Sequence, residues 1–397
     1  MKKTLIVVTL LAAGTSQAAG LTIDTQSGRA TGMGSVGAAS SKDSSSIYYN
    51  PAGILGVNKL DAQLGDSLIL IDLGFTPSGG TEQRQNSVAP PPHAYFAYKF
   101  DEKAAAGLGV FTPYGANINW PDDFVGRFFG RKSQVLTFDL NPTVAYAPLP
   151  WLRIGAGFQA VYGTLHVSQN INYIVAEGLV SLSGNDWGFG YNAGVQADVV
   201  PKLLTLGVQY RSKVKLNITG DADFQNIPPE FVPLTPPDQP FTFDVTMPAS
   251  LALGASVTPL PRLTVAADVN WIEWSSVKQV YFQLRDNPSA NPPRPKNWEN
   301  RVNLHVGAEY GVTDALAVRA GFILDPTPTP ENTLSPDLPD ASRPNFTVGA
   351  GYAFAPFRVD AGYHLIVLRE QRSTFQPLPG SYDGVAHVIS LTFGYSQ

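Results

Sequence analysis

The sequence predicts an all-β fold, a fourteen-stranded antiparallel transmembrane β-barrel with an N-terminal plug, or hatch, in its lumen. Three features predict it: few charged residues, a period-two alternation of apolar and polar residues, and tight turns that alternate with long polar loops. Charged residues make up 15% of the 397 residues, against roughly 25% in soluble domains. No apolar run of 18 residues follows position 18, so membrane-spanning helices are not expected.

Residues 1–18 are predicted to be a secretory signal peptide. Lys2 and Lys3 form a basic start, an apolar run follows, and Ser16 to Ala18 has the small residues of a cleavage site. The absence of cysteine excludes disulfides and a lipoprotein anchor. No basic cluster indicates nucleic acid as a partner.

Residues 19–58 are predicted to form the plug. Fourteen strands enclose more space than their own side chains fill, so another segment must occupy the lumen. This one is rich in Gly, Ala and Ser, which let a backbone approach other surfaces closely. It ends in a turn at Asn50, Pro51 and Ala52, because a residue before proline is pushed away from helical geometry.

Gly32, Gly34 and Gly37 match the dinucleotide-binding pattern G-x-G-x-x-G. That pattern requires an apolar strand before it and a βαβ unit around it, and neither is present. We therefore expect no nucleotide, no other cofactor and no metal.

Residues 59–397 are predicted to form the barrel. In the stretch 152–163, Leu152, Ile154 and Phe158 share one face, and Arg153 and Gln159 share the other. Tyrosine and tryptophan collect at segment ends, as in the aromatic girdles of outer-membrane barrels. A soluble sandwich would also alternate, but it would carry more charge on its solvent face.

The turns give the strand count. Six tight connections lie at residues 101–103, 148–150, 200–202, 259–261, 312–314 and 355–357. Seven long stretches separate them, near residues 76–92, 113–132, 167–185, 219–242, 286–297, 326–343 and 372–384. Several strands exceed the 9–11 residues that span a bilayer, so the barrel should rise above the membrane. We expect a monomer in the outer membrane of a Gram-negative-type cell, in contact with lipid and lipopolysaccharide.

The order and spacing of several motifs resemble the FadL-type family of outer-membrane long-chain fatty-acid and hydrocarbon transporters. They are the glycine-rich segment with its Tyr49–Gly53 turn, Thr112–Gly115, Leu140–Tyr146 and Gly349–Tyr352, and the match runs over nearly the whole mature chain. The resemblance implies a hatch whose turn at residues 50–52 links an inner pocket to a sideways exit through the wall. One departure is the chain end, which is Ser-Gln after Tyr395 and lacks a terminal aromatic residue.

Candidate site residues follow from the apolar character of the expected ligand and from the alternation of inward and outward residues along each strand. Each buried methylene contributes about 0.8 kcal/mol, so capture of a long chain must be mainly apolar. The wall opening is placed where glycine and proline weaken a strand, at Gly107, Gly109 and Pro113. The outer loops offer Trp120, Phe124, Phe128, Phe129, Phe224 and Phe231 for capture. The inward parity offers the cations Arg153, Arg211, Lys213 and Arg319, with Glu309 or Asp360 as salt-bridge partners.

The predicted function is passive uptake of long-chain fatty acids or other hydrophobic compounds through a plugged barrel with a lateral exit. Two alternatives stay open: a transporter of aromatic hydrocarbons, and a general porin or structural barrel, which would lack a plug. An enzyme would need a Ser-His-acid set, and the five histidines stand in no such motif. We therefore expect no catalytic residues.

Overall fold

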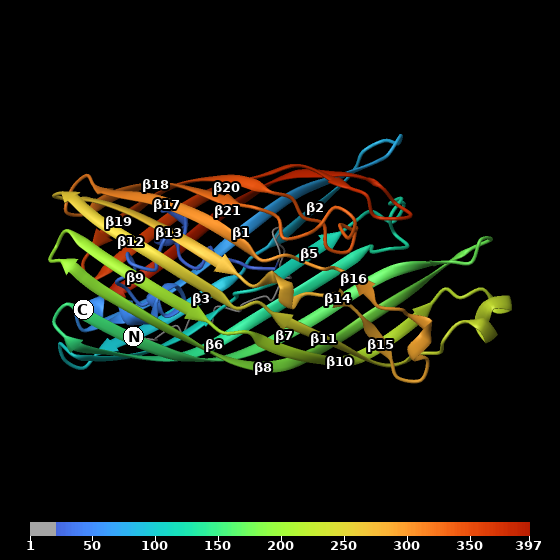
Figure 1. Ribbon diagram of the computed structural model, residues 1–397, viewed down its shortest axis with the longest axis horizontal. Helices are drawn as coiled ribbons and strands as arrows, with labels where there is room; N and C mark the ends of the chain where they lie inside the picture. Colours follow the sequence, from blue (N-terminus) through green and yellow to red (C-terminus); the bar gives the residue numbers. More distant parts are fainter. Residues whose placement is uncertain (1–20) are drawn as a thin grey trace, which may run out of the picture.

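The computed structural model describes residues 21–397, and the predicted signal peptide lies outside the described residues. The chain forms a long β-barrel whose wall strands pair antiparallel (Figure 1). Within the described range, none of the helices has the length and apolar character needed to cross a membrane.

The wall is built from long strands joined by hairpins. The strands are β1 (Leu60–Pro77), β2 (Gln83–Ala89), β3 (Pro92–Lys99), β4 (Ala104–Phe111), β5 (Gly115–Asn119), β6 (Lys132–Leu149), β7 (Leu152–Asn172), β8 (Glu177–Val200), β9 (Leu204–Arg211), β10 (Val214–Gln225), β11 (Gln239–Met247), β12 (Ser250–Leu260), β13 (Leu263–Ile272), β14 (Gln279–Val280), β15 (Phe282–Leu284), β16 (Arg294–Pro295), β17 (Arg301–Gly311), β18 (Leu316–Asp325), β19 (Arg343–Phe354), β20 (Phe357–Ser373) and β21 (Gly380–Ser396). The helical elements are α1 (Gly28–Gly32), α2 (Ser46–Tyr49) and the 3-10 turns η1 (Pro51–Gly56), η2 (Pro229–Leu234), η3 (Trp274–Ser276) and η4 (Pro288–Ala290).

These segments make a closed barrel of fourteen strands, which confirms the prediction. Several wall strands are interrupted, so that β2 and β3, β4 and β5, β9 and β10, β11 and β12, and β13 and β15 each form one strand in two pieces. The barrel closes where β1 pairs with β21, from Asp61 opposite Ser396 to Pro77 opposite Gly380. The six tight turns all join consecutive strands at one end, where the C-terminus also lies (Figure 1).

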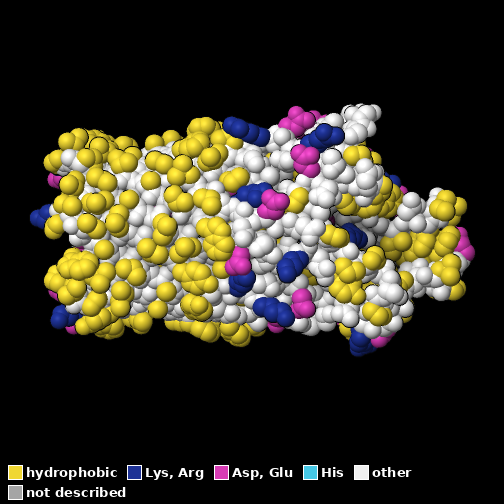
Figure 2. All heavy atoms as spheres, in the orientation of Figure 1, with side chains coloured by type: hydrophobic (Ala, Val, Ile, Leu, Met, Phe, Trp, Pro, Cys, Tyr) yellow, Lys and Arg dark blue, Asp and Glu magenta, His cyan; other side chains and the backbone are white. Residues whose placement is uncertain are grey.

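The outer surface of the barrel has two zones. Figure 2 shows hydrophobic side chains over the half that carries the short turns, and charged side chains over the other half. On β7, Phe158 points outward and is 50% exposed, whereas Gln159 faces the lumen and is fully buried. Farther along the same strand, Val161 and Leu165 are buried inside the barrel. Because water surrounds the loop-side half, its apolar side chains turn inward and fill that part of the lumen.

The segment from residue 21 to residue 58 lies inside the turn-side half of the barrel and is almost entirely buried. Ser27 caps α1, since its Oγ accepts a hydrogen bond from the Ala30 backbone N–H at 3.1 Å. Asn50 caps η1 in the same way, and Pro51 occupies the first position of that turn. We call residues 21–58 the inner segment.

The exposed apolar half predicts how the protein behaves without detergent. We expect it to leave membranes only in detergent and to migrate differently on gels before and after boiling, because its strand ladder survives detergent at room temperature. A boiled sample is the control. Recovery of a soluble, folded monomer in detergent-free buffer would contradict a membrane-embedded barrel.

Candidate functional site

Asn50 joins the inner segment to two wall strands. Its side-chain Nδ2 lies 2.6 Å from the carbonyl oxygen of Ala38, 3.1 Å from that of Val195 on β8 and 3.2 Å from that of Val208 on β9. Its Oδ1 accepts the backbone N–H of Ala52 at 3.1 Å. The side chain therefore shapes the turn and also ties it to the wall.

Two wall glycines make room for this turn. A Cβ atom on Gly194 of β8 would lie 2.0 Å from Oδ1 of Asn50, and one on Gly155 of β7 would lie 2.4 Å from the carbonyl carbon of Pro51. Neither distance is possible between real atoms, so any larger residue would displace the turn. The turn is thus seated against bare backbone.

Ion pairs hold the start of the inner segment on the opposite wall. Arg29 binds Glu309 of β17 through two parallel hydrogen bonds of 3.0 Å each. Nε of Arg319 donates to the same Glu309 at 2.6 Å, and Arg319 also pairs with Asp360 at 2.7 Å. Parallel contacts of this kind fix the guanidinium plane as well as its charge.

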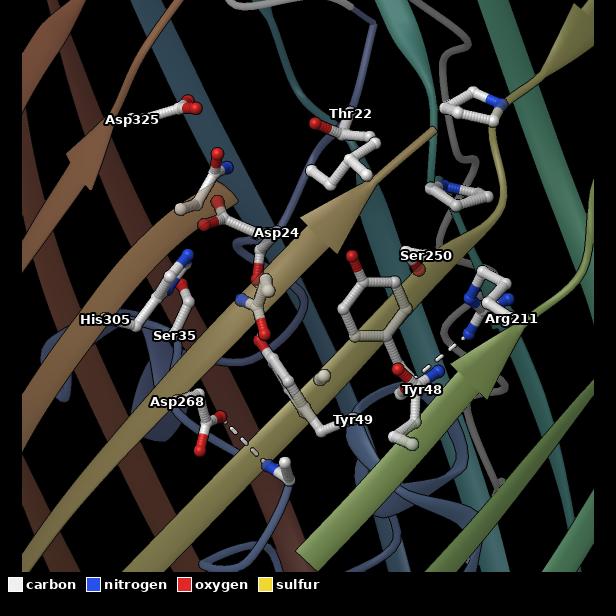
Figure 3. A pocket seen from close by; sticks show the side chains of 18 of the residues that line it. Thr22, Asp24, Ser35, Tyr48, Tyr49, Arg211, Ser250, Asp268, His305 and Asp325 are labelled. Atoms are coloured by element: carbon white, nitrogen blue, oxygen red, sulfur yellow. Dashed lines mark hydrogen bonds between the residues drawn. The ribbon is translucent and has the colours of Figure 1, made fainter. Parts of the chain in front are cut away.

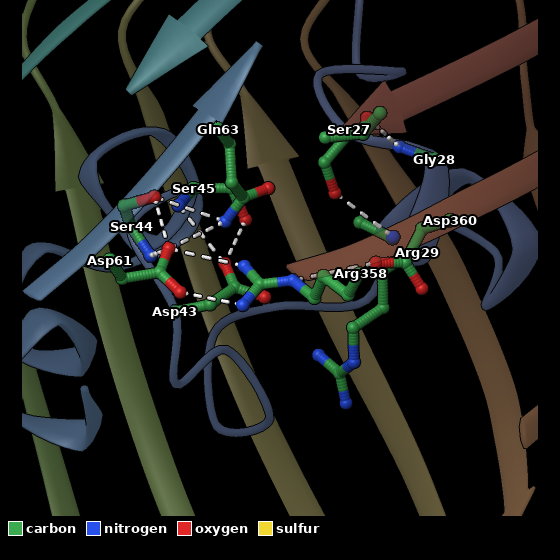
Figure 4. A network of polar contacts seen from close by, with 12 residues as sticks. Ser27, Gly28, Arg29, Asp43, Ser44, Ser45, Asp61, Gln63, Arg358 and Asp360 are labelled. Atoms are coloured by element: carbon green, nitrogen blue, oxygen red, sulfur yellow. Dashed lines mark hydrogen bonds and ion pairs between the residues drawn. The ribbon is translucent and has the colours of Figure 1, made fainter. Parts of the chain in front are cut away.

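A second ion pair lies beside the first. Arg358 of β20 reaches Asp61 of β1 with nitrogen–oxygen distances of 2.6 and 3.1 Å. Asp61 in turn accepts the backbone N–H of Ser44 at 3.0 Å (Figure 4). Residues 28–44 are therefore attached to the wall from β17 round to β1.

The glycine-rich motif serves packing. The N–H groups of Gly37 and Ala38 donate to Asp268 at 2.7 and 3.0 Å, and the N–H of Gly34 donates to Thr347 Oγ1 at 2.9 Å. Gly34 has a φ of 66°, which glycine adopts without strain. The backbone N–H groups that would bind a phosphate in a dinucleotide-binding motif here bind the carboxylate of Asp268.

A polar cavity of about 110 Å³ lies between the inner segment and the wall. Tyr48 and Tyr49 of the segment line it together with Arg211, Asp268 and His305 of the wall (Figure 3). Arg211 donates to the carbonyl oxygen of Tyr48 at 3.2 Å and stands 5.0 Å from the centre of its ring. We call this space the inner cavity.

An apolar cavity of about 50 Å³ lies farther toward the loops. Leu21 of the inner segment contributes to it, and the wall supplies Leu165, Ile218, Phe243 and Val280 among others. It adjoins the inner cavity, because consecutive residues line the two spaces. Leu21 and Met247 line the apolar cavity, and the residues that follow them, Thr22 and Pro248, line the inner cavity.

Two openings lead from this apolar cavity toward the loops. The first, of about 250 Å³, is lined by Tyr173, Phe224 and Leu234, and we call it the outer groove. The second, of about 750 Å³, is lined by Phe128, Phe375 and neighbouring loop residues, and we call it the loop cleft. Arg294 lines both openings and the apolar cavity as well.

Arg294 is a cation that sequence reasoning missed. It donates to the carbonyl oxygen of Phe129 at 2.9 Å and to Oε1 of Gln169 at 2.7 Å, and both acceptors are neutral. Among residues 21–397, no carboxylate forms an ion pair with it. The nearby Asp337 is paired with Lys296 at 2.7 Å. Burial alone would raise the pKa of Asp337, but Lys296 and Arg294 hold that pKa below its ordinary value.

The wall is broken near Pro113. The ladder between β3 and β4 ends at Ala94 opposite Val110, and within the described chain no ladder joins β2 to β5. The inner segment supplies the missing partner. The N–H of Ile23 donates to Pro113 O at 2.9 Å, and the N–H of Gly115 donates to Leu21 O at 2.8 Å.

Gly107 and Gly109 do not cause this break. Both stay in the regular ladder, opposite Ala97 and Tyr95. Cβ atoms on these two glycines would lie 3.0 and 2.9 Å from side-chain carbons of Ile47, so their role is to admit the inner segment. Of the three residues predicted for the wall opening, Pro113 lies at the interruption.

The predicted capture residues separate into three groups. Trp120 and Phe124 are 2% and 0% exposed and stack at 4.2 Å, so they form core and no capture surface. Phe128 and Phe129 line the loop cleft, and Phe224 lines the outer groove. Phe231 packs on Tyr173 at 4.8 Å, next to the outer groove. The loop before β6 folds inward, which the sequence did not indicate.

Three of the four predicted lumen cations face inward, each in an ion pair. Arg153 pairs with Asp198 at 2.9 Å, Arg211 pairs with Asp139 at 3.0 Å, and Arg319 has the partners given above. Lys213 is wrong as a lumen residue: it is 44% exposed and pairs with Glu273 outside. The interruption between β9 and β10 resets the alternation, so residues 211 and 213 no longer share a face.

A family model described as "Outer membrane protein transport protein (OMPP1/FadL/TodX)" matches residues 9–396. The chain belongs to this family. The 47 kDa outer membrane protein of Pasteurella multocida (strain Pm70) is 25% identical over 415 residues, with 96% of this chain and 95% of the relative covered. The long-chain fatty acid transport protein of Salmonella typhi is 23% identical over 388 residues, with 89% and 88% covered. The protein is thus an outer-membrane barrel.

Solved structures of family members share this fold. A Pseudomonas aeruginosa FadL homologue superimposes with a TM-score of 0.88 at 21% identity, over 95% of this chain and 100% of that one. The toluene transporter TodX of P. putida gives 0.73 at 16% identity, over 96% and 99%. At these identities the likeness concerns the fold.

Gly194→Ala tests the seat of the turn. The added Cβ would collide with Oδ1 of Asn50, so we expect a folded barrel whose displaced turn gives channel openings that the native protein lacks. Single-channel recording in planar bilayers measures this. Gly311→Ala is the control, because its Cβ would lie 3.4 Å from Cβ of Arg262 in ordinary contact. A closed Gly194→Ala channel would mean that the turn does not seal the barrel.

Proposed function

We propose that this protein takes up long-chain fatty acids or related hydrophobic compounds by passive diffusion, with residues 19–58 as the plug of the barrel formed by residues 59–397. One observation carries the proposal. The outer groove, the apolar cavity and the inner cavity adjoin one another and lead from the loops to the inner segment. The name of the Salmonella typhi relative supports the same class of substrate.

The physical basis of capture is the apolar lining of this route. Each methylene removed from water contributes about 0.8 kcal/mol, so a chain of a dozen or more gains roughly 10 kcal/mol. The route ends beside the wall break at Pro113, which also lines the inner cavity. The substrate leaves there into the bilayer, so it need not cross the periplasmic end of the barrel. The protein acts as a monomer, and lipopolysaccharide packs around its loop-side half.

The inner segment keeps water-soluble compounds out. It is buried and attached to opposite walls, which an open porin would not need. Liposome swelling separates the two functions: sugars should enter liposomes slowly with the intact protein and fast after deletion of residues 19–56. Fast sugar entry through the intact protein would identify a porin.

Asn50→Ala tests the role of the turn in transport. Loss of the amide removes its hydrogen bonds to β8 and β9, and each unpaired buried group costs about 1–3 kcal/mol. This is enough to reset a plug that moves between two positions a few kcal/mol apart, so uptake should fall while the barrel stays folded.

Asn50→Gly separates turn formation from wall attachment. Glycine can form the turn but cannot reach Val195 or Val208, so we expect it to transport as poorly as alanine. Uptake of a labelled fatty acid by cells, normalised to the amount of folded barrel on gels, is the measurement. Full uptake with glycine would reduce Asn50 to a turn former.

The substrate class divides family members, because toluene transporters are among the similar structures. Arg294 favours a substrate with an acidic head over a neutral aromatic hydrocarbon. Its guanidinium borders the whole entry region and is contacted by neutral acceptors alone within the described chain. A substrate carboxylate would give the Arg294 guanidinium a charged partner and accept charge-assisted hydrogen bonds from it.

Arg294→Gln tests this preference. We expect about tenfold weaker binding of oleate, because a hydrogen bond to a charged group contributes about 1.5–3 kcal/mol, and unchanged binding of oleyl alcohol. Calorimetry on detergent-exchanged protein measures both. Arg285→Gln is the matched control, because Arg285 pairs with Asp286 at the surface and lines none of the three spaces. Equal losses for acid and alcohol would show that Arg294 only shapes the groove.

A further inference from the structure

Asp66 points out of the barrel into its apolar band. The neighbouring Ser67 faces the lumen, where its Oγ donates to Thr25 O at 2.6 Å, so alternation turns Asp66 outward. On the same outer face, Leu64 is 61% exposed, and Leu391, which lies directly opposite Asp66 on β21, is 55% exposed. Asp66 is the seventh residue of β1. Six steps of about 3.3 Å along a strand tilted by about 45° place it about 14 Å from the short-turn end, in an apolar band about 25 Å tall.

Among residues 21–397, the side chain of Asp66 forms no hydrogen bond and no ion pair, although its backbone belongs to the ladders with β3 and β21. Three inward carboxylates of the same barrel, Asp61, Asp139 and Asp360, are paired with arginine. A lipid-facing carboxylate costs stability, so such a residue in a membrane protein points to a function.

The location supplies the function. Asp66 stands opposite Pro92 on β3. The ladder between β3 and β4 ends two residues farther along, at Ala94 opposite Val110, so continuing its register would place Thr112 in the same row as Pro92 and Asp66. Thr112 belongs to the interruption before Tyr114. Asp66 is therefore one strand away from the wall break, on its lipid side.

We propose that Asp66 binds the head group of an amphiphilic substrate as it leaves the wall break, and that this head group is a hydrogen-bond donor, either a hydroxyl or an uncharged carboxyl. The proposal rests on the uptake function proposed above. The carboxyl oxygen of Asp66 accepts a hydrogen bond from a hydroxyl or an uncharged carboxyl, and offers nothing to a hydrocarbon without a donor. Arg294 and Asp66 thus meet the head group at the two ends of the route. An acid head meets Arg294 as an anion, takes up a proton from solvent water, and meets Asp66 as an uncharged carboxyl.

The test separates release from binding. Asp66→Leu, Asp66→Asn and wild type are reconstituted into proteoliposomes, and transfer of oleic acid, oleyl alcohol and hexadecane into the bilayer is timed. For Asp66→Leu we expect about tenfold slower transfer of the acid and the alcohol, unchanged transfer of hexadecane, and unchanged equilibrium binding of oleate in detergent. Asp66→Asn keeps an oxygen acceptor and should restore most of the alcohol rate.

His387→Leu is the matched control. His387 also faces outward from the wall, but its Nδ1 lies 2.7 Å from the hydroxyl oxygen of Tyr363, so its polar group is already satisfied. It should not change any of the three rates. Equal slowing of all three ligands by Asp66→Leu, or no slowing of any, would overturn the role of Asp66. If the wild-type protein transfers none of the three faster than empty liposomes, the uptake function itself is wrong.

A stability measurement excludes a purely structural role. Asp66→Leu replaces a lipid-facing carboxyl with an apolar side chain, so its unfolding midpoint in urea should be higher than that of wild type. A lower midpoint would show that Asp66 supports the fold, and would overturn its assignment to the exit.

Discussion

A wall of fourteen strands has an interior that its own side chains do not fill, and the molecule depends on how the inner segment fills the turn-side half of it. Apolar residues of the segment such as Ile47 and Ile54 pack against the wall. The segment is also held by hydrogen bonds and ion pairs to inward polar groups such as Asp268, Glu309 and Asp61. Buried ion pairs contribute little net stability, but removing one partner leaves an uncompensated charge and costs about 3–5 kcal/mol. The pairs therefore fix position more than they add stability.

The two media around the barrel explain the rest of the architecture. Where lipid surrounds the wall, apolar side chains point outward and polar ones meet the inner segment. Where water surrounds it, Val161, Leu165 and their neighbours turn inward and create the apolar space that a hydrophobic ligand needs. One continuous strand, β7, takes part in both arrangements, so the ligand route and the membrane anchor are made by the same element.

Sequence reasoning succeeded where a rule is periodic or local. Alternation and turn residues gave fourteen strands, and Asn50 before Pro51 gave the turn, because both follow from backbone geometry. It failed for Lys213, where a strand interruption resets the alternation, and for Trp120 and Phe124, where a loop folds into the barrel. Arg294 lies among prolines in a long loop, where no period exists to indicate which way a side chain points. Such features depend on tertiary packing, which local patterns do not contain.

The attachments of the inner segment differ in kind from one side to the other. From β17 round to β1 they include bidentate ion pairs. At β8 and β9 they are hydrogen bonds to backbone carbonyl oxygens, donated by Asn50 and, from the wall, by Asn192, Gln196 and Arg211. Neutral hydrogen bonds exchange with water at little cost, but buried charges do not. The segment is therefore fixed most firmly along its charged side, and under the proposed uptake function the part that moves when a ligand enters the inner cavity is the Asn50 turn, while residues 28–44 stay in place.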